Sequence, residues 1–172
     1  MHMFGKGYVL EGEMRDLLVA FDGSECSFRA VDYVGKQFSG LGDVKITLFH
    51  VLPNLPAYLW DDGHILSPGE REERERVCQK WLANQKLRIE PLFDKARRIL
   101  QEQGVNGNQI ETKTKSDVAD VAESILEEAR TGNYYTLVVG RCGLSARERY
   151  FTGSTTTSII NKGRGLAICV VE

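Results

Sequence analysis

Short apolar runs alternate with longer amphipathic segments along most of this chain. Four of these runs have the length and the Val, Ile and Leu content of buried strands, at residues 16–21, 45–52, 136–139 and 166–171. Residues 110–115 alternate instead and predict an edge strand. In the segments between them, apolar residues recur every three or four positions, as on one face of a helix. Strands separated by helices predict an α/β fold: a doubly wound parallel sheet with right-handed crossovers and helices on both faces.

A long connection follows the second strand, from Pro53 to Arg88. Prolines disfavour regular structure in its first part. The mixed charges from Glu70 onward predict a solvated helix face, which we expect to continue to about Ile89 and to kink or restart at Pro91. The sequence leaves open whether this connection covers the binding site described below.

Composition is that of an ordinary globular protein. The 172 residues suffice for one domain, and we predict a loose leader at residues 1–15 and a single domain at residues 16–172. The formal net charge of −2 gives no general attraction to nucleic acid or anionic membranes, and no apolar run is long enough for membrane insertion. Because the N-terminus lacks a signal-peptide pattern, we expect a cytoplasmic protein.

The four cysteines lie far apart in the sequence, at positions 26, 78, 142 and 169. They form no CxxC pair, and the histidines show no metal-ligand spacing with them. We therefore expect free thiols in a reducing compartment. Arg141 and a nearby helix start would lower the pKa of Cys142, but no second cysteine is close to it in sequence.

The most distinctive stretch, residues 136–158, joins a buried strand to a helix through three glycines. The strand ends at Gly140, a second turn follows at Gly143, and Gly153 precedes a cluster of hydroxyl residues that begins the helix. Glycines let backbone N–H groups approach an anion, and a helix N-terminus leaves N–H donors unpaired. The pattern suits a polyphosphate, although Gly153-Ser154 also fits a plain helix cap and no Walker lysine follows.

The turns after the first and fourth strands are predicted to lie at the same edge of the sheet. In doubly wound sheets, ligands bind beyond the carboxyl ends of the strands, where the strand order reverses. If the first and fourth strands are neighbours, Asp22 after the first and Gly140 after the fourth both open onto that crevice. His50, near the end of the second strand, is interpreted as a hydrogen-bonded core residue, because no ligand partner lies near it in sequence.

Together these features resemble the universal stress protein family, over nearly everything from residue 16 to the C-terminus. The resemblance rests on residues 19–27 (VAFDGSECS), on His50-Val51, and above all on the pattern GxxG-x9-GS that begins at Gly140. It implies a five-stranded, Rossmann-like parallel sheet in the order 3-2-1-4-5. The glycine pattern is that of the family's ATP-binding branch.

The resemblance also implies nucleotide contacts, residue by residue. The positions implied for the base and the ribose are Ala20, Phe21, Asp22 and Val51. The positions implied for the phosphate loop and its far wall are Gly140, Arg141, Gly143, Gly153, Ser154, Thr155 and Thr156. The implied cofactor is ATP, with Mg²⁺ or Mn²⁺ left open, and no catalytic residue is assigned.

The leading hypothesis is an ATP-binding stress-response or signalling protein that acts through its nucleotide-bound state. We expect slow or no hydrolysis, because fast phosphoryl transfer needs a group that orients water, and the glycine loop offers no Asp or His for this. The alternative is a protein-interaction module of the same fold that does not use nucleotide. An adenylating enzyme is disfavoured, since the turn after the first strand is Asp22-Gly23-Ser24 rather than serine–glycine–glycine.

A homodimer through the last strand, Leu166 to Val171, is the expected assembly. This strand is apolar on both faces and is expected at a sheet edge, where unpaired backbone groups invite another chain. The resemblance implies antiparallel pairing of this strand across a twofold axis. Coverage by the leader or by the long connection of the same chain is the alternative.

Overall fold

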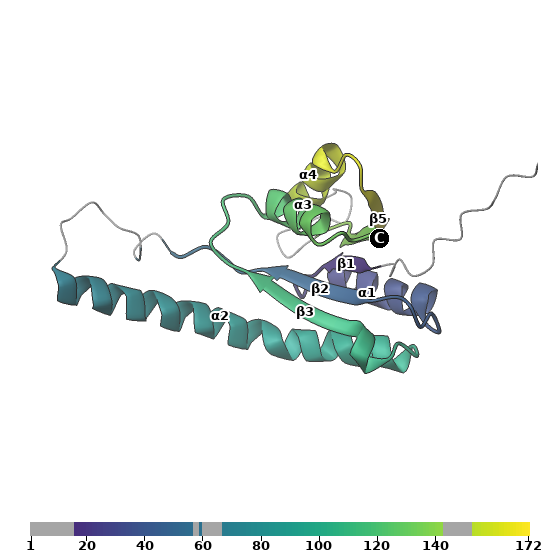
Figure 1. Ribbon diagram of the computed structural model, residues 1–172, viewed down its shortest axis with the longest axis horizontal. Coiled ribbons are helices and arrows are strands. Elements are labelled where there is room, and N and C mark those ends of the chain that lie inside the picture. The colour runs from purple at the N-terminus through teal and green to yellow at the C-terminus, as the bar shows by residue number, and fades with distance from the viewer. Residues whose placement is uncertain (1–15, 57–58, 60–66, 143–152) are drawn as a thin grey trace, which may run out of the picture.

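The computed structural model describes residues 16–56, 59, 67–142 and 153–172. It contains one parallel sheet (Figure 1), whose strands are β1 (Leu17–Ala20), β2 (Ile46–Val51), β3 (Ile110–Lys115), β4 (Thr136–Gly140) and β5 (Ala167–Val171). Their order is β3-β2-β1-β4-β5, so the predicted topology is confirmed. The predicted leader, residues 1–15, lies outside the described residues.

β1 forms the centre of the sheet, between β2 and β4. Leu17, Leu18 and Val19 are buried, as expected of a strand covered on both faces. Ala20 pairs in register with residues near the ends of both neighbouring strands. The carboxyl ends of β1, β2 and β4 therefore meet at one edge of the sheet, and the turn after β1 lies beside Gly140.

Helices cover both faces of this sheet (Figure 1). One face carries α1 (Glu25–Phe38) and α2 (Pro68–Glu102), and the other carries α3 (Val121–Thr131) and α4 (Ser154–Lys162). Each face has its own apolar core, as a doubly wound fold requires. A short 3₁₀ turn, Gly107–Gln109, leads from α2 into β3.

In the described part of the chain, no helix has both the length and the apolar character needed to span a membrane.

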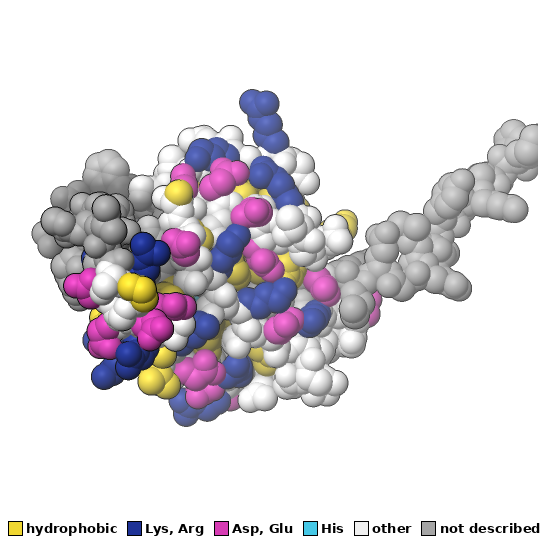
Figure 2. Space-filling model, turned by 60° about the vertical axis from the view of Figure 1, so that its left-hand side comes forward, with side chains coloured by type: hydrophobic (Ala, Val, Ile, Leu, Met, Phe, Trp, Pro, Cys, Tyr) yellow, Lys and Arg dark blue, Asp and Glu magenta, His cyan; other side chains and the backbone are white. Residues whose placement is uncertain are grey.

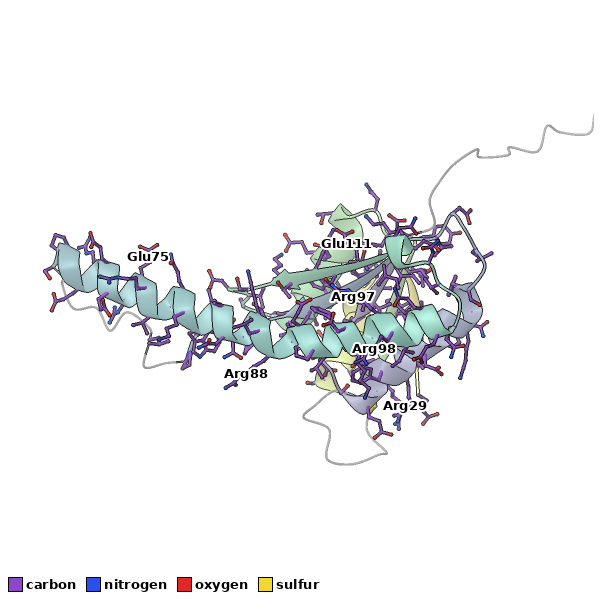
Figure 3. All side chains as sticks on the ribbon, turned by 90° about the horizontal axis from the view of Figure 1, so that it is seen from below. Arg29, Glu75, Arg88, Arg97, Arg98 and Glu111 are labelled. Atoms are coloured by element: carbon purple, nitrogen blue, oxygen red, sulfur yellow. A yellow bond between two sulfur atoms is a disulfide. The ribbon has the colours of Figure 1, made fainter. Side chains whose placement is uncertain are left out.

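The long helix α2 has a packed half and a projecting half. Its buried residues all lie in the second half: Ile89, Phe93, Ala96 and Leu100. In that half, Arg97 Nη2 donates a hydrogen bond to Thr112 Oγ1 of β3, at 2.7 Å. The first half, which includes Glu75, extends beyond the sheet (Figures 1 and 3). Its acidic and basic side chains are interspersed on the surface (Figure 2).

Pro91 lies inside α2, which runs without interruption from Pro68 to Glu102. The predicted restart at this residue is therefore wrong, and the alternative of a kink stays a prediction. A proline within a helix leaves the carbonyl four residues earlier without its helical donor. That carbonyl belongs to Leu87, which is 70% exposed, so water is available to it. The cost of the missing hydrogen bond is thereby reduced.

The start of α3 is capped by a carboxylate. The N-cap is Asp120, which accepts from the backbone N–H of Ala122 at 2.8 Å and of Glu123 at 3.1 Å. Asp117 has a φ of 59°, in the left-handed region that Asp tolerates better than most residues. It therefore forms part of the turn before the helix.

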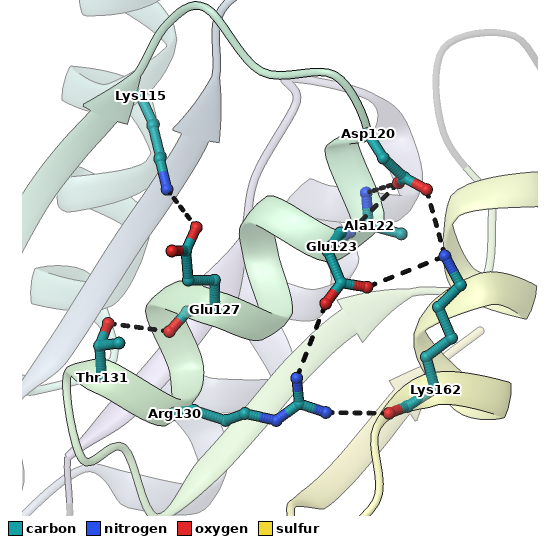
Figure 4. Close-up of polar contacts among 8 residues, drawn as sticks. All are labelled: Lys115, Asp120, Ala122, Glu123, Glu127, Arg130, Thr131 and Lys162. Atoms are coloured by element: carbon teal, nitrogen blue, oxygen red, sulfur yellow. Dashed lines mark hydrogen bonds and ion pairs between the residues drawn. The ribbon is translucent and has the colours of Figure 1, made fainter.

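Polar contacts link α3 to α4 (Figure 4). Lys162 Nζ lies 3.2 Å from Asp120 Oδ2, and the backbone oxygen of Lys162 accepts from Arg130 Nη2 at 2.9 Å. The last residue of α4 thus contacts both ends of α3. These exposed pairs add little stability individually, but they help to fix the direction of α4 relative to the sheet.

Candidate functional site

A cavity of ≈ 250 Å³ opens at the carboxyl end of the sheet. Its walls come from the ends of β1, β2 and β4 and from the first turns of α1, α3 and α4. The residues that line it are Ala20, Phe21, Asp22, Ser27, Phe49, His50, Val51, Val121, Ile125, Val139, Gly140, Cys142, Gly153, Ser154, Thr155, Thr156 and Ile159. The cavity thus lies where the crevice of a doubly wound sheet is expected.

The turn after β1 forms one wall and is held by its own side chains. Asp22 Oδ1 accepts from the backbone N–H of Ser24 at 2.9 Å. Ser24 is the N-cap of α1, and its Oγ accepts from the N–H of Ser27 at 3.2 Å. Between them, Gly23 has a φ of +77°, a conformation that favours glycine. These bonds fix the position of the Asp22 carboxylate at the cavity.

His50 joins β2 to this turn. Its Nδ1 lies 2.8 Å from the carbonyl oxygen of Phe21, which can only accept, so the proton is on Nδ1. The prediction of a hydrogen-bonded histidine is confirmed, although His50 also lines the cavity. Burial lowers the pKa of His50 below its ordinary value of 6.5, while the Phe21 hydrogen bond and the Asp22 charge act in the opposite direction. The ring is therefore neutral at pH 7.

The lowered pKa of His50 predicts a loss of stability in mild acid. The unfolded chain binds this proton more readily than the folded chain, so the contribution to stability is complete above about pH 6.5 and falls as the pH drops below it. We expect urea unfolding to show a larger decrease from pH 7.5 to pH 5 in wild type than in His50→Asn. Asparagine retains a donor for Phe21 without titrating. Equal decreases in the two proteins would contradict the assignment.

The opposite wall is the junction of β4 with α4. Thr156 Oγ1 donates to the carbonyl oxygen of Gly140 at 2.8 Å, and the Gly153 N–H donates to the carbonyl oxygen of Arg141 at 2.9 Å. The N-cap of α4 is Gly153, which offers no capping side chain, so the Gly153-Ser154 pair begins this helix without a side-chain cap. Among the described residues, no acceptor bonds the N–H groups of residues 154–156.

That uncapped first turn gives the cavity an anion-binding character. Unpaired N–H groups and the positive end of the helix dipole both favour negative charge at a helix N-terminus. Three residues of this turn, Ser154, Thr155 and Thr156, line the cavity. The cavity therefore has the Asp22 carboxylate at one wall and, at the other, backbone N–H donors that favour an anion.

Most residues predicted for the site come together around this cavity. Nine of the eleven line it: Ala20, Phe21, Asp22, Val51, Gly140, Gly153, Ser154, Thr155 and Thr156. Arg141 does not; its Nη2 lies 3.3 Å from Glu172 Oε1, and its backbone N–H donates to Val171. Gly143 lies outside the described residues. Whether these residues bind a nucleotide stays a prediction.

Several lining residues were not assigned from sequence. Val121 and Ile125 belong to the apolar stripe of α3, and their four-residue spacing places both on the cavity side of the helix. A second cavity of ≈ 420 Å³ adjoins the first and shares four lining residues with it: Asp22, His50, Val51 and Val121. It extends toward Arg88 and Leu92 of α2. The crevice is therefore longer than the sequence indicated.

The expectation of four free thiols is wrong for two of them. Cys26 and Cys142 are joined by a disulfide, with their Cα atoms 5.8 Å apart, whereas Cys78 and Cys169 are free. The pair is 116 residues apart in sequence. It meets because β1 and β4 are neighbours, which brings the first turn of α1 to the end of β4.

Comparison with known proteins agrees with this architecture. The model of the universal stress protein family matches residues 13–164. The chain belongs to the universal stress protein family. Among curated protein sequences, none matches the chain.

Solved universal stress proteins share the fold at low sequence identity. The chain is similar to UspA from Lactobacillus plantarum, with a TM-score of 0.64, 15% identity, and 92% of this chain and 98% of that one covered. A family protein from Arabidopsis thaliana with AMP bound gives a TM-score of 0.57 at 18% identity, covering 91% and 90%. One from Archaeoglobus fulgidus in complex with dAMP gives 0.56 at 13% identity, covering 94% and 99%.

Proposed function

We propose that this universal stress protein binds ATP and acts in a stress response or in signalling through its nucleotide-bound state. The observation that carries the proposal is the cavity between Asp22 and the uncapped start of α4. The similar Arabidopsis and Archaeoglobus proteins were solved with AMP and dAMP, which supports an adenine nucleotide as the ligand class.

The residues around the cavity fit the parts of such a nucleotide. Apolar side chains of Val51, Val121 and Ile125 suit a purine base, and the Asp22 carboxylate suits the hydroxyls of a ribose. The N–H groups and hydroxyls at the start of α4 suit phosphates. Arg141 is paired with Glu172 in this structure, so its proposed contact with phosphate requires that ion pair to open.

Slow or absent hydrolysis is part of the same proposal. Rapid phosphoryl transfer needs an acid–base group that orients water at the γ-phosphate. Of the described residues that line the cavity, Asp22 and His50 are the candidates for that role, and both lie at the β1 and β2 ends. The proposed phosphate wall is at α4, across the cavity from them. A Mg²⁺ or Mn²⁺ ion accompanying the phosphates is also part of the proposal.

The test compares ATP binding to wild type and to Asp22→Asn by calorimetry. Asparagine still accepts from the Ser24 N–H, so the turn is kept while the charge is lost. Because hydrogen bonds to charged groups contribute about 1.5–3 kcal/mol, we expect affinity to fall about 10-fold to 100-fold. Asp43→Asn, in the exposed loop before β2, is the control and should bind as wild type does. Unchanged affinity in Asp22→Asn would contradict the proposed ribose contact.

A protein-interaction module that does not use nucleotide is the second candidate. Exposed apolar side chains along α2 favour it: Val77, in the projecting first half, is 41% exposed, and Leu87, just before the buried residues of the second half, is 70% exposed. Mass spectrometry of small molecules released on denaturing gently purified protein separates the two candidates. A bound adenine nucleotide supports the first. Its absence, together with no calorimetric ATP binding, supports the second.

We also propose a homodimer through β5, in a cytoplasmic protein. β5 is at the edge of the described sheet, and Ala167 and Val170 are exposed, the latter at 40%. An apolar edge strand invites pairing with another chain. Light scattering at tens of micromolar is expected to show a dimer for wild type and a monomer for Ala167→Lys with Val170→Lys. A wild-type monomer, or a dimer that survives both lysines, would refute this interface.

A further inference from the structure

We propose that Cys26 and Cys142 form a thiol–disulfide switch that sets the affinity of the nucleotide cavity. The inference rests on the proposed nucleotide binding and adds a regulatory modification to that site. Cys142 lines the cavity, two residues after Gly140, and Cys26 lies in the first turn of α1, beside the turn that holds Asp22. The bond therefore links the two walls between which the nucleotide is proposed to lie.

The surroundings of the two sulfur atoms favour reversible chemistry. Cys26 Sγ accepts a hydrogen bond from Arg29 Nη2 at 3.0 Å, and Cys26 is the second residue of α1. A nearby arginine and a helix N-terminus both stabilise a thiolate, which makes Cys26 a good leaving group when the bond is reduced. Cys26 is only 4% exposed, whereas Cys142 is half-buried and faces the cavity. The sulfur open to attack is therefore that of Cys142.

Oxidation is a balanced exchange with a small disulfide such as glutathione disulfide. The Cys142 thiolate attacks one sulfur of the small disulfide, forms a mixed disulfide and releases one small thiol. The Cys26 thiolate then attacks Cys142 Sγ, forms the protein disulfide and releases the second small thiol. The protein loses two electrons and two protons, and the small disulfide gains both. Reduction by excess small thiol reverses these steps.

The bond acts on the proposed phosphate wall because Gly140 is held in the sheet, where it pairs in register with Val171 of β5 and its carbonyl oxygen accepts from Thr156 Oγ1. A Cβ placed on Gly140 would be 2.7 Å from the carbonyl carbon of Cys26, so strand and helix are already in close contact there. Two unbonded sulfur atoms need more room than two bonded ones. On reduction the extra separation therefore falls on Cys142, next to Arg141, whose carbonyl holds Gly153 at the start of α4.

The oxidised protein is thus the tight-binding form. With the bond intact, the end of β4 and the start of α4 are held in the arrangement that forms the cavity. Reduction loosens this arrangement, and binding must then restore the order, which weakens affinity. Because an oxidising environment forms the disulfide, it favours the nucleotide-bound state of the protein.

The experiment uses the full chain with Cys78→Ser and Cys169→Ser, so that only this pair titrates. Calorimetry measures ATP affinity after equilibration with glutathione disulfide and again with excess reduced glutathione. We expect affinity to be at least tenfold lower in the reduced form, and Cys142→Ser to match the reduced form in both buffers. Equal affinity in the two states, tighter binding by the reduced protein, or a bond that excess glutathione does not reduce would overturn the switch.

Hydrogen exchange separates failure of the switch from failure of the proposed nucleotide function. We expect faster amide exchange at residues 140–142 and 153–157 in the reduced protein without ligand. If ATP binds in neither state but exchange increases on reduction, the nucleotide proposal fails and redox control of the cavity stands. Unchanged exchange would reject the control itself.

The role of Arg29 is tested by the rate at which glutathione reduces the disulfide. Arg29→Gln should slow reduction of the bond by glutathione about tenfold, because the leaving thiolate loses its partner. Arg98→Gln, an exposed arginine on α2, is the matched control and should leave the rate unchanged. Equal rates of disulfide reduction in the two variants would contradict a role for Arg29 in stabilising the leaving thiolate.

Discussion

Replacing Gly140 with alanine is expected to lower the free energy of unfolding by about 3 kcal/mol and to weaken ATP binding. The added Cβ would lie 2.7 Å from the Cys26 carbonyl carbon and 2.8 Å from its oxygen. These are backbone atoms of α1, so no side chain can rotate to make room. Either α1 or the end of β4 must move, and both form walls of the cavity.

Gly42→Ala is the matched control for this substitution. Nothing lies within 4 Å of a Cβ placed on Gly42, in the exposed loop before β2, so we expect a change within about 0.5 kcal/mol. Urea unfolding of both variants, in reducing and oxidising buffer, measures the effect and its dependence on the disulfide. Equal stability of the two variants would show that α1 and β4 separate at little cost.

The sheet and the location of the cavity followed from the sequence because both depend on simple periodicities. Buried apolar runs separated by helical stripes predicted the strands, and the family resemblance supplied their order. Once β1 and β4 are neighbours, the turns at Asp22 and Gly140 must share one edge of the sheet. Nine of the eleven predicted residues therefore line one cavity.

The details that sequence missed depend on side-chain direction and local exposure. Arg141 follows the end of β4, and its guanidinium pairs with Glu172 after the end of β5 instead of lining the cavity, a contact that sequence patterns do not indicate. Pro91 is tolerated because the carbonyl it leaves without a donor belongs to the exposed Leu87.

The cysteine pair was missed because proximity was sought along the sequence. The predicted strand order, however, already places the two cysteines near each other. Cys26 follows the turn after β1, and Cys142 follows the end of β4, and these two strands are neighbours. Spacing rules recognise cysteines that are close in sequence, whereas this pair is brought together by the topology of the sheet.

Phe93→Ala is expected to have the largest effect on stability, a loss of about 3–5 kcal/mol. Phe93 is 1% exposed and belongs to the packed half of α2. Its ring stacks on Phe21, with centroids 5.5 Å apart, and meets the edge of His50 at 6.4 Å. Both neighbours line the cavity, so the void left by the missing ring would also loosen one wall of the site.

Leu87→Ala, at an exposed position of the same helix, separates the effect of packing from that of helix propensity. Both substitutions place alanine in α2, but Leu87 is 70% exposed, so we expect its loss to change the unfolding free energy by no more than about 0.5 kcal/mol. Urea unfolding gives the stabilities, and calorimetry at a temperature where Phe93→Ala remains folded gives the ATP affinity. We expect weaker binding in Phe93→Ala alone, because the Phe21 carbonyl that holds His50 loses its support from α2. If Phe93→Ala is destabilised but binds ATP as wild type does, α2 stabilises the fold without shaping the site.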